Sequence, residues 1–187
     1  MTTGTEIPGF VTGTWNIDPS HSDVSFTVRH MMVSKVRGRF SRVAGEIVTA
    51  DNPLESAVTA TIDLDSIDTN APQRDAHIRS ADFFEVEKYP TMTYRSTGLR
   101  ADGEDFLLDG ELDLHGVTRP VTLKLELGGF GPDALNPAGG TRVGFSASGE
   151  INRRDFGIDI TMPMDGGGVV VGDKVQIALE IEAVLAS

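Results

Sequence analysis

The chain has 187 residues, no cysteine, and 16 Lys and Arg against 28 Asp and Glu, a net charge of −12. A chain of this length buries a core without disulfides, and the missing cysteines exclude thiolate metal sites and iron–sulfur clusters. Because so acidic a surface repels phosphate groups, a nucleic-acid partner is not expected. The 21 glycines and 9 prolines make up about 16% of the chain, above the ~12% that these residues usually contribute. This excess indicates many turns and hence β-structure.

The first ten residues contain neither a basic segment nor the apolar stretch of a secretory signal. We therefore expect a cytoplasmic protein. No linker or internal repeat divides the chain, so the sequence predicts an N-terminal tail at 1–12 and a single domain at 13–187.

The dominant sequence pattern is an alternation of apolar and polar residues, which is typical of strands with one face on an apolar interior. Two-residue links such as Asp102-Gly103 and His115-Gly116 predict hairpin turns. These features predict an all-β, antiparallel meander, and closure into a barrel would remove its free edges. The expected strands, about nine, lie at 15–17, 24–30, 40–48, 58–64, 92–95, 106–114, 121–127, 143–151 and 175–185.

A helical insertion is expected at about 71–88, between two strands. Asn70 precedes a proline and is predicted to cap a short helix over 74–80, in which Asp75 and Arg79 are spaced to pair on the surface. A second helix start is predicted at Asp82, and Pro90 prevents its continuation.

No motif of a catalytic or metal site is found. The segment 18–23 holds Asp18, Ser20 and His21, but neighbours in one segment rarely form a triad, so a turn bonded to local backbone is expected. The four histidines lack the i,i+2 or i,i+4 spacing that pairs metal ligands on a strand or helix.

Alternation turns Phe26, Val28 and His30 toward the interior. His30 is then either a core histidine with one hydrogen bond or a polar contact inside a ligand cavity. Arg74 and His77 share a helix face, which is either solvated surface or a polar group at the mouth of the barrel. The sequence leaves both alternatives open.

Small residues also occur at inward positions, namely Gly110, Ala147 and Gly149. They either leave a channel through the interior or permit close packing of neighbouring strands. An eight-stranded barrel is just wide enough to hold one slim ligand.

The segment 24–45 contains five Lys and Arg and no acid, in contrast to the rest of the chain. A solvated strand face is one interpretation, and contact with anionic lipid head groups at a membrane surface is the other.

Four ordered segments resemble one family, the YceI-like or polyisoprenoid-binding proteins, along nearly the whole chain. They are 14–40 (with TWNIDPSHS, VSFTVRH and VRGRF), 74–91 (RDAHIRSADFF and YPT), 110–121 (GELDLHGVTRPV) and 151–157 (INRRDFG). The resemblance implies a lipocalin-like antiparallel barrel of eight strands whose lumen holds a long isoprenoid chain, in some members that of a quinone. It also implies a helical insertion near the mouth, a homodimer in several members, and no demonstrated catalysis. We expect no cofactor other than a bound polyisoprenoid lipid.

The predicted function is binding, transport or storage of a polyisoprenoid lipid or isoprenoid quinone. The alternatives are an enzyme acting on such a ligand, with His30 or His77 and Asp75 as acid–base groups, and a ligand-free, stress-related barrel with a filled lumen that acts through its surface. Phe83 and Phe84 are expected near the opening. The expected ligand-binding residues are Phe26, Val28, His30, Phe40, Arg74, His77, Phe83, Phe84, Phe145 and Ala147.

Overall fold

The computed structural model describes residues 7–30, 34–159 and 171–186, and for His30 and Val171 it describes the backbone alone. Over this part of the chain, no helix has the length and apolar composition needed to cross a membrane. The elements are β1 (Gly13–Ile17), η1 (Pro19–His21), β2 (Asp23–His30), β3 (Ser34–Phe40), β4 (Val43–Thr49), η2 (Pro53–Glu55), β5 (Ala57–Asp63), η3 (Leu64–Ser66), β6 (Ile67–Asp68), α1 (Pro72–Arg79), β7 (Thr91–Asp102), β8 (Asp105–Leu114), β9 (Val117–Pro132), β10 (Thr141–Asn152), η4 (Arg153–Phe156) and β11 (Val171–Leu185).

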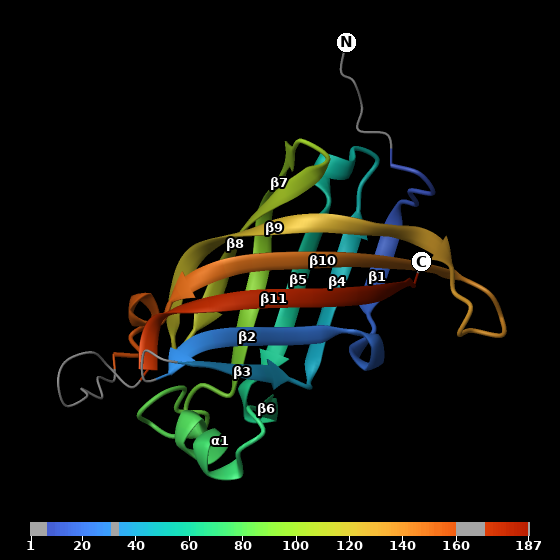
Figure 1. Ribbon diagram of the computed structural model, residues 1–187. Helices are drawn as coiled ribbons and strands as arrows, with labels where there is room; N and C mark the ends of the chain where they lie inside the picture. The colour runs from blue at the N-terminus through green and yellow to red at the C-terminus, as the bar shows by residue number, and fades with distance from the viewer. Residues whose placement is uncertain (1–6, 31–33, 160–170, 187) are drawn as a thin grey trace.

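The described strands form one antiparallel sheet of eleven segments that closes on itself (Figure 1). Three pairs of consecutive segments, β1–β2, β3–β4 and β5–β6, each follow a single path with a break in the middle, so the chain makes eight passes. The eighth pass, β11, pairs with β10 along one edge and with both β1 and β2 along the other. The expected eight-stranded antiparallel barrel is therefore confirmed.

Local chemistry explains the breaks in two of these passes. Between β1 and β2, Asp18 accepts a hydrogen bond from the backbone N–H of Ser20 and caps the 3-10 turn that begins at Pro19. Between β5 and β6, Asp63 caps the next 3-10 turn in the same way, through the N–H of Asp65. Such side-chain bonds compete with the strand ladder, and the strand bends there.

Both predicted hairpins form; the second turn is His115-Gly116 as predicted, whereas the first is Gly103-Glu104, one residue beyond the predicted Asp102-Gly103. Asp102 pairs with Asp105, and Leu114 pairs with Val117, so two residues form each turn. In the second turn His115 and Gly116 both have positive φ, 57° and 75°. This conformation matches the right-handed twist of the flanking strands, which explains the tight link between β8 and β9.

The helical insertion differs from the prediction in its details. The helix α1 is present, but Asn70 does not cap it: Asn70 adopts φ 66°, and Ala71 occupies the N-cap without a side-chain bond. The predicted second helix at Asp82 is wrong, because residues 81–84 and 86–88 form turns. The left-handed φ of 51° at Glu85 explains this, since one such residue interrupts a right-handed helix.

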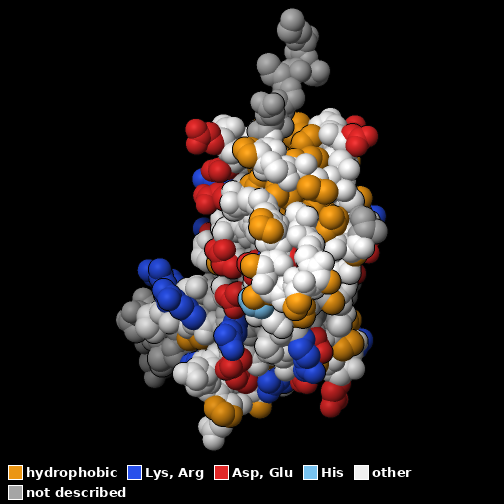
Figure 2. Space-filling model, turned by 90° about the vertical axis from the view of Figure 1, so that its right-hand side faces the viewer, with side chains coloured by type: hydrophobic (Ala, Val, Ile, Leu, Met, Phe, Trp, Pro, Cys, Tyr) orange, Lys and Arg blue, Asp and Glu red, His pale blue; other side chains and the backbone are white. Residues whose placement is uncertain are grey.

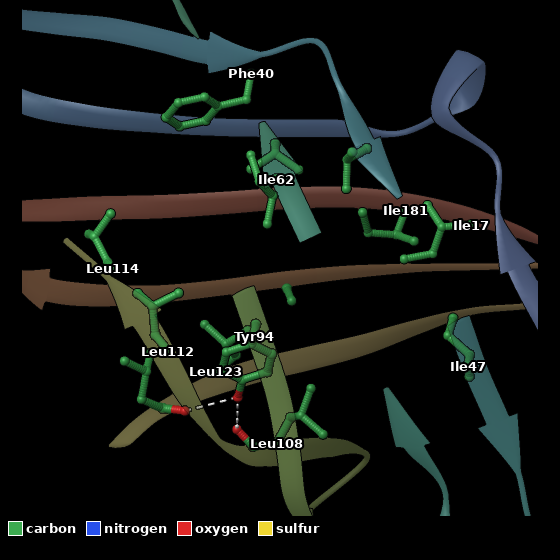
Figure 3. Packing of buried hydrophobic residues seen from close by; sticks show 14 of the residues in the cluster. Ile17, Phe40, Ile47, Ile62, Tyr94, Leu108, Leu112, Leu114, Leu123 and Ile181 are labelled. Carbon is green, nitrogen blue, oxygen red and sulfur yellow. Dashed lines mark hydrogen bonds between the residues drawn. The ribbon is translucent and has the colours of Figure 1, made fainter. Parts of the chain in front are cut away.

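Trp15 fills the end of the barrel interior opposite α1, and its side chain is fully buried. Its indole N–H donates to Thr49 Oγ1 at 2.9 Å, and its ring packs edge-on against Phe130 with centroids 5.5 Å apart. Phe10, from the expected N-terminal tail, also packs edge-on against Phe130, with centroids 5.4 Å apart. The apolar interior that follows Trp15 is shown in Figure 3, where side chains from several strands gather inside the barrel.

Candidate functional site

A cavity of about 300 Å³ occupies the interior between the Trp15 end and α1. Its volume is at the lower end of the ~300–1,000 Å³ usual for ligand pockets. The filled lumen expected for the ligand-free alternative is therefore not found. Among the predicted ligand-binding residues, those that line the cavity are Phe26, Val28, Phe40, Arg74, His77, Phe83, Phe84, Phe145 and Ala147.

Alternation along the strands explains how the lining is built. Phe26 and Val28 come from β2, and Phe145 and Ala147 come from β10 at positions two residues apart. The side chain of His30, two residues beyond Val28, lies outside the described residues, so both interpretations of this histidine stay predictions. What the lining residues do for a ligand likewise stays a prediction.

Aromatic rings form a continuous part of the wall toward α1. Phe26 packs against Phe40 with ring centroids 5.6 Å apart, and Phe40 packs against Phe84 at 6.1 Å. Phe83 packs edge-on against the His77 ring at 5.1 Å. The insertion therefore completes the apolar surface that begins on β2 and β3, and its two phenylalanines lie at the α1 end of the cavity.

Two of the inward glycines serve close packing and leave no channel. A Cβ on Gly110 would lie 2.4 Å from the Tyr94 ring, and a Cβ on Gly149 would lie 2.7 Å from Leu123. Neighbouring side chains thus already fill the space that these glycines free. Ala147, by contrast, borders the cavity itself.

Arg74 and His77 supply polar groups to the α1 end of the cavity wall. Arg74 donates from Nε to Thr69 Oγ1 at 2.8 Å and from Nη2 to the Thr69 carbonyl oxygen. The Nε2 atom of His77 lies 2.8 Å from a carboxylate oxygen of Asp82. Both side chains are half-buried. Their exposure is thus intermediate between a solvated surface and a buried polar group at the mouth of the barrel, the two alternatives that the sequence left open.

The predicted surface pair of Asp75 and Arg79 is wrong. Asp75 is 6% exposed and accepts hydrogen bonds from the backbone N–H and the hydroxyl of Thr69. Arg79 instead pairs with Asp65 at 3.4 Å and donates to the carbonyl oxygen of Ile67 at 3.1 Å. Asp75 therefore anchors α1 to the segment after β6, and it is not the partner of His77 that the enzyme alternative required.

Arg153 borders the cavity and was not predicted to do so. It is 5% exposed, donates to the carbonyl oxygens of Ile158 at 2.7 Å and Gly172 at 3.0 Å, and pairs with Asp173 at 3.2 Å. Burial lowers the pKa of its guanidinium group. Arg153 follows β10 in the turn η4, where strand alternation no longer predicts the direction of a side chain. The one signal for this residue in the sequence was its place in the segment 151–157, which resembles the family.

Tyr94 is a second lining residue that the prediction omitted. Its hydroxyl donates to the carbonyl oxygen of Val121 at 2.9 Å and also lies 3.3 Å from that of Leu108 (Figure 3). Burial raises the pKa of this hydroxyl, so it stays protonated and its hydrogen bond persists. The alternation in β7 already placed Tyr94 on the inward face.

The segment 18–23 forms the expected turn, away from the cavity lining. The imidazole Nδ1 of His21 lies 2.9 Å from Asp18, which also accepts from Arg142 at 2.8 Å. Ser22 donates to the carbonyl oxygen of Glu182 in β11. The expectation of bonds to local backbone is therefore wrong for this serine. Among the described residues, no group of three or more His, Asp or Glu is arranged to hold a metal ion.

Comparisons with known proteins agree with this architecture. Protein YceI of Escherichia coli O17:K52:H18 (strain UMN026 / ExPEC) is 43% identical over 139 residues, which cover 74% of this chain and 71% of the relative. Burkholderia cenocepacia BcnA superposes with a TM-score of 0.72 at 22% identity, covering 89% of this chain and 98% of that one.

A second solved structure has the same fold. A polyisoprenoid binding domain from Saccharophagus degradans superposes with a TM-score of 0.70 at 19% identity, covering 94% of this chain and 99% of that domain. The family model for the YceI-like domain matches residues 15–183. The family model thus matches nearly the whole barrel, including the insertion at one end. The chain therefore belongs to the YceI-like family.

Proposed function

We propose that this barrel binds a polyisoprenoid lipid or the chain of an isoprenoid quinone in its lumen and stores or carries it. The observation that carries the proposal is the apolar-lined cavity of about 300 Å³ inside the barrel. The polyisoprenoid binding domain from Saccharophagus degradans, which shares the fold, supports the ligand class.

The lining favours a chain-like apolar ligand on energetic grounds. Each buried methylene contributes about 0.8 kcal/mol, so ten of them give about 8 kcal/mol, the free energy of a micromolar complex, before the costs of association are subtracted. Burial of the apolar chain therefore supplies the main attraction in the proposed complex. Selectivity for the head group then depends on the few polar side chains at the α1 end, Arg74, His77 and Arg153.

The proposal is tested by extracting the purified protein with organic solvent and identifying the lipid by mass spectrometry. The variant Ala147→Trp places an indole in the cavity from the buried wall of β10. We expect it to fold, because the cavity offers space, and to retain at least tenfold less isoprenoid than the parent, since a tenfold loss requires only about 1.4 kcal/mol.

Ser148→Trp is the matched control. Ser148 is the next residue on the same strand and is exposed on the outer face, so the same side chain there leaves the lumen unchanged. Equal retention by the parent and Ala147→Trp would contradict a ligand path past β10. If the parent yields no isoprenoid and takes up none from detergent solution, the proposed function is wrong.

A further inference from the structure

A basic strip follows the outer face of β2 and β3. It consists of Arg29, Lys35, Arg37 and Arg39, whose side chains are all exposed. Lys35, Arg37 and Arg39 alternate along β3 and span about 13 Å at the usual rise of a strand, and Arg29 lies directly opposite Lys35 on β2. The antiparallel register therefore places four cations on one side of the sheet.

The charge of the basic strip is not neutralised by nearby carboxylates. Within the described part of the chain, none of its four residues forms an ion pair, whereas the next cation, Arg42, pairs with Asp63 and Asp65 at 3.4 Å. Two carboxylates border the strip at the Arg39 end without forming an ion pair with it: Asp68, which lies opposite Arg39 in the register, and Asp23, which lines a surface depression with Arg37 and Arg39. Within the described residues, the basic strip is thus an exposed, locally positive surface on a chain with a net charge of −12.

The basic strip lies on the outer side of the wall that borders the cavity. Val28 and Val36 alternate with its residues and line the cavity, whereas Lys35, Arg37 and Arg39 do not. Arg29, near the end of β2, is exposed and also borders the cavity. Figure 1 shows β3 as the wall strand beside α1 and β6. On the face in Figure 2, most Lys and Arg side chains lie in the lower half, toward the α1 end, while hydrophobic side chains are more frequent above.

We propose that the basic strip docks the barrel, by its α1 end, on the surface of an anionic lipid bilayer. The inference rests on the proposed function, because a protein that carries an isoprenoid must take it up from a membrane or return it there. Each Lys or Arg near an anionic membrane surface strengthens binding about fivefold. At physiological ionic strength charges act over about 8 Å, so the acidic remainder of the molecule is largely screened from the bilayer.

A nucleic acid is the less suitable anionic partner for this surface. Single strands bind where exposed aromatic rings interleave with the cations and stack on bases. The aromatic side chain at the end of β3 is Phe40, which is 5% exposed and lines the cavity on the opposite side of the wall.

The test is co-sedimentation of the full chain with vesicles at about 0.15 M salt, comparing phosphatidylcholine alone with a mixture containing about a third phosphatidylglycerol. We expect binding to the anionic vesicles alone. The triple variant Lys35→Gln, Arg37→Gln, Arg39→Gln should bind these vesicles on the order of 100-fold more weakly. Equal binding to both lipid compositions, or by parent and triple variant, would overturn the proposal.

The matched control removes the same charge elsewhere, with Arg95→Gln, Lys124→Gln and Lys174→Gln on β7, β9 and β11. These residues are exposed, so the control tests whether position or net charge decides binding. A control as weak as the triple variant would contradict a specific docking surface. Displacement from vesicles by millimolar glycerol phosphate would instead assign the strip to an isolated phosphate, and preferential binding of a single-stranded oligonucleotide would assign it to nucleic acid.

Retention of lipid separates this inference from the proposed function. The triple variant alters the outer face alone, so isoprenoid loaded from detergent solution should be retained as in the parent. A variant that retains lipid and no longer binds vesicles supports both proposals. A parent that binds anionic vesicles but never holds an isoprenoid would contradict the proposed function and leave the docking surface without its stated role.

Discussion

At the scale of single residues, several inward positions are decided by how close a neighbouring side chain lies. Gly110 faces the interior between Leu108 and Leu112, and Tyr94 from the adjacent strand occupies the space that a larger side chain would need. Tyr94 on β7 in turn reaches across β8 to the carbonyl oxygen of Val121 on β9. Position 110 therefore requires a glycine, because the Tyr94 ring leaves no space for a Cβ.

We predict that Gly110→Ala lowers the free energy of unfolding by about 1–3 kcal/mol, the usual effect of an overpacked core. The new Cβ would lie 2.4 Å from the Tyr94 ring and 2.8 Å from the backbone oxygen of Arg95, and that backbone cannot move aside easily. Urea unfolding measures the change. Gly98→Ala is the control, because nothing lies within 4 Å of its added Cβ, and a loss as large as that of Gly110→Ala would contradict the packing argument.

At the scale of the elements, α1 is held by buried hydrogen bonds rather than by its own amphipathic pattern. Asp75 accepts two bonds from Thr69, and Arg74 donates two bonds to the same threonine. These bonds place the following turn, with Phe83 and Phe84, against the cavity. A helix of eight residues has little stability in isolation, so these contacts determine whether it forms.

We predict that Asp75→Ala lowers the free energy of unfolding by about 1–3 kcal/mol, because it leaves the buried donors of Thr69 without a partner. Thermal or urea unfolding measures the loss. In a double-mutant cycle with Arg79→Ala, the coupling energy should be near zero, since the two side chains have separate partners. A coupling energy of about 0.5 kcal/mol, or an Asp75→Ala variant as stable as the parent, would contradict this prediction and support an exposed ion pair between Asp75 and Arg79.

At the scale of the whole molecule, a cluster around Arg142 joins parts of the chain that are far apart in sequence. Arg142 on β10 contacts Asp18 between β1 and β2 at 2.8 Å, Asp133 after β9 at 3.1 Å and Glu182 on β11 at 3.5 Å. The cluster therefore ties the barrel together next to the place where β1 pairs with β11. The Arg142 guanidinium lowers the pKa of Asp18 below its ordinary value.

This lowered pKa predicts a pH-dependent contribution to stability. The carboxylate stabilises the fold above about pH 4, the ordinary pKa of aspartate in the unfolded chain, and the contribution is lost as the pH falls through the lowered pKa of the native state. Asp18→Asn should therefore lower the melting temperature by a few degrees at pH 7, and its difference from the parent should shrink below pH 4.

Thermal unfolding of both proteins between pH 7 and pH 2 measures this effect. Asp51→Asn serves as the control, because Asp51 is exposed and the structure shows no ion pair for it. A difference between Asp18→Asn and the parent that stays constant down to pH 2 would show that the charge of Asp18 does not stabilise the fold.

The sequence by itself determined most of the strands, the turn between β8 and β9, and the face that each expected strand turns inward. The strand β3 (Ser34–Phe40) was not expected, because the prediction placed one strand at 40–48. Alternation is a local property, and a side chain on a strand has just two directions in which to point, so Phe26, Phe145 and Ala147 were placed on the inner wall before any contact was known. The turn at His115-Gly116 was equally local, because two residues with positive φ suffice to form it.

The tertiary structure alone decided the volume of the lumen and the surroundings of the insertion. Whether Gly110 opens a channel depends on Tyr94 from the next strand, and the exposure of Asp75 depends on how Thr69 and the end of β6 pack over α1. Arg153 enters the cavity wall from a turn that has no period. Each outcome depends on atoms that closure of the barrel brings together. The alternation in a sequence predicts the direction of a side chain, but it does not contain the distance to the neighbouring residues.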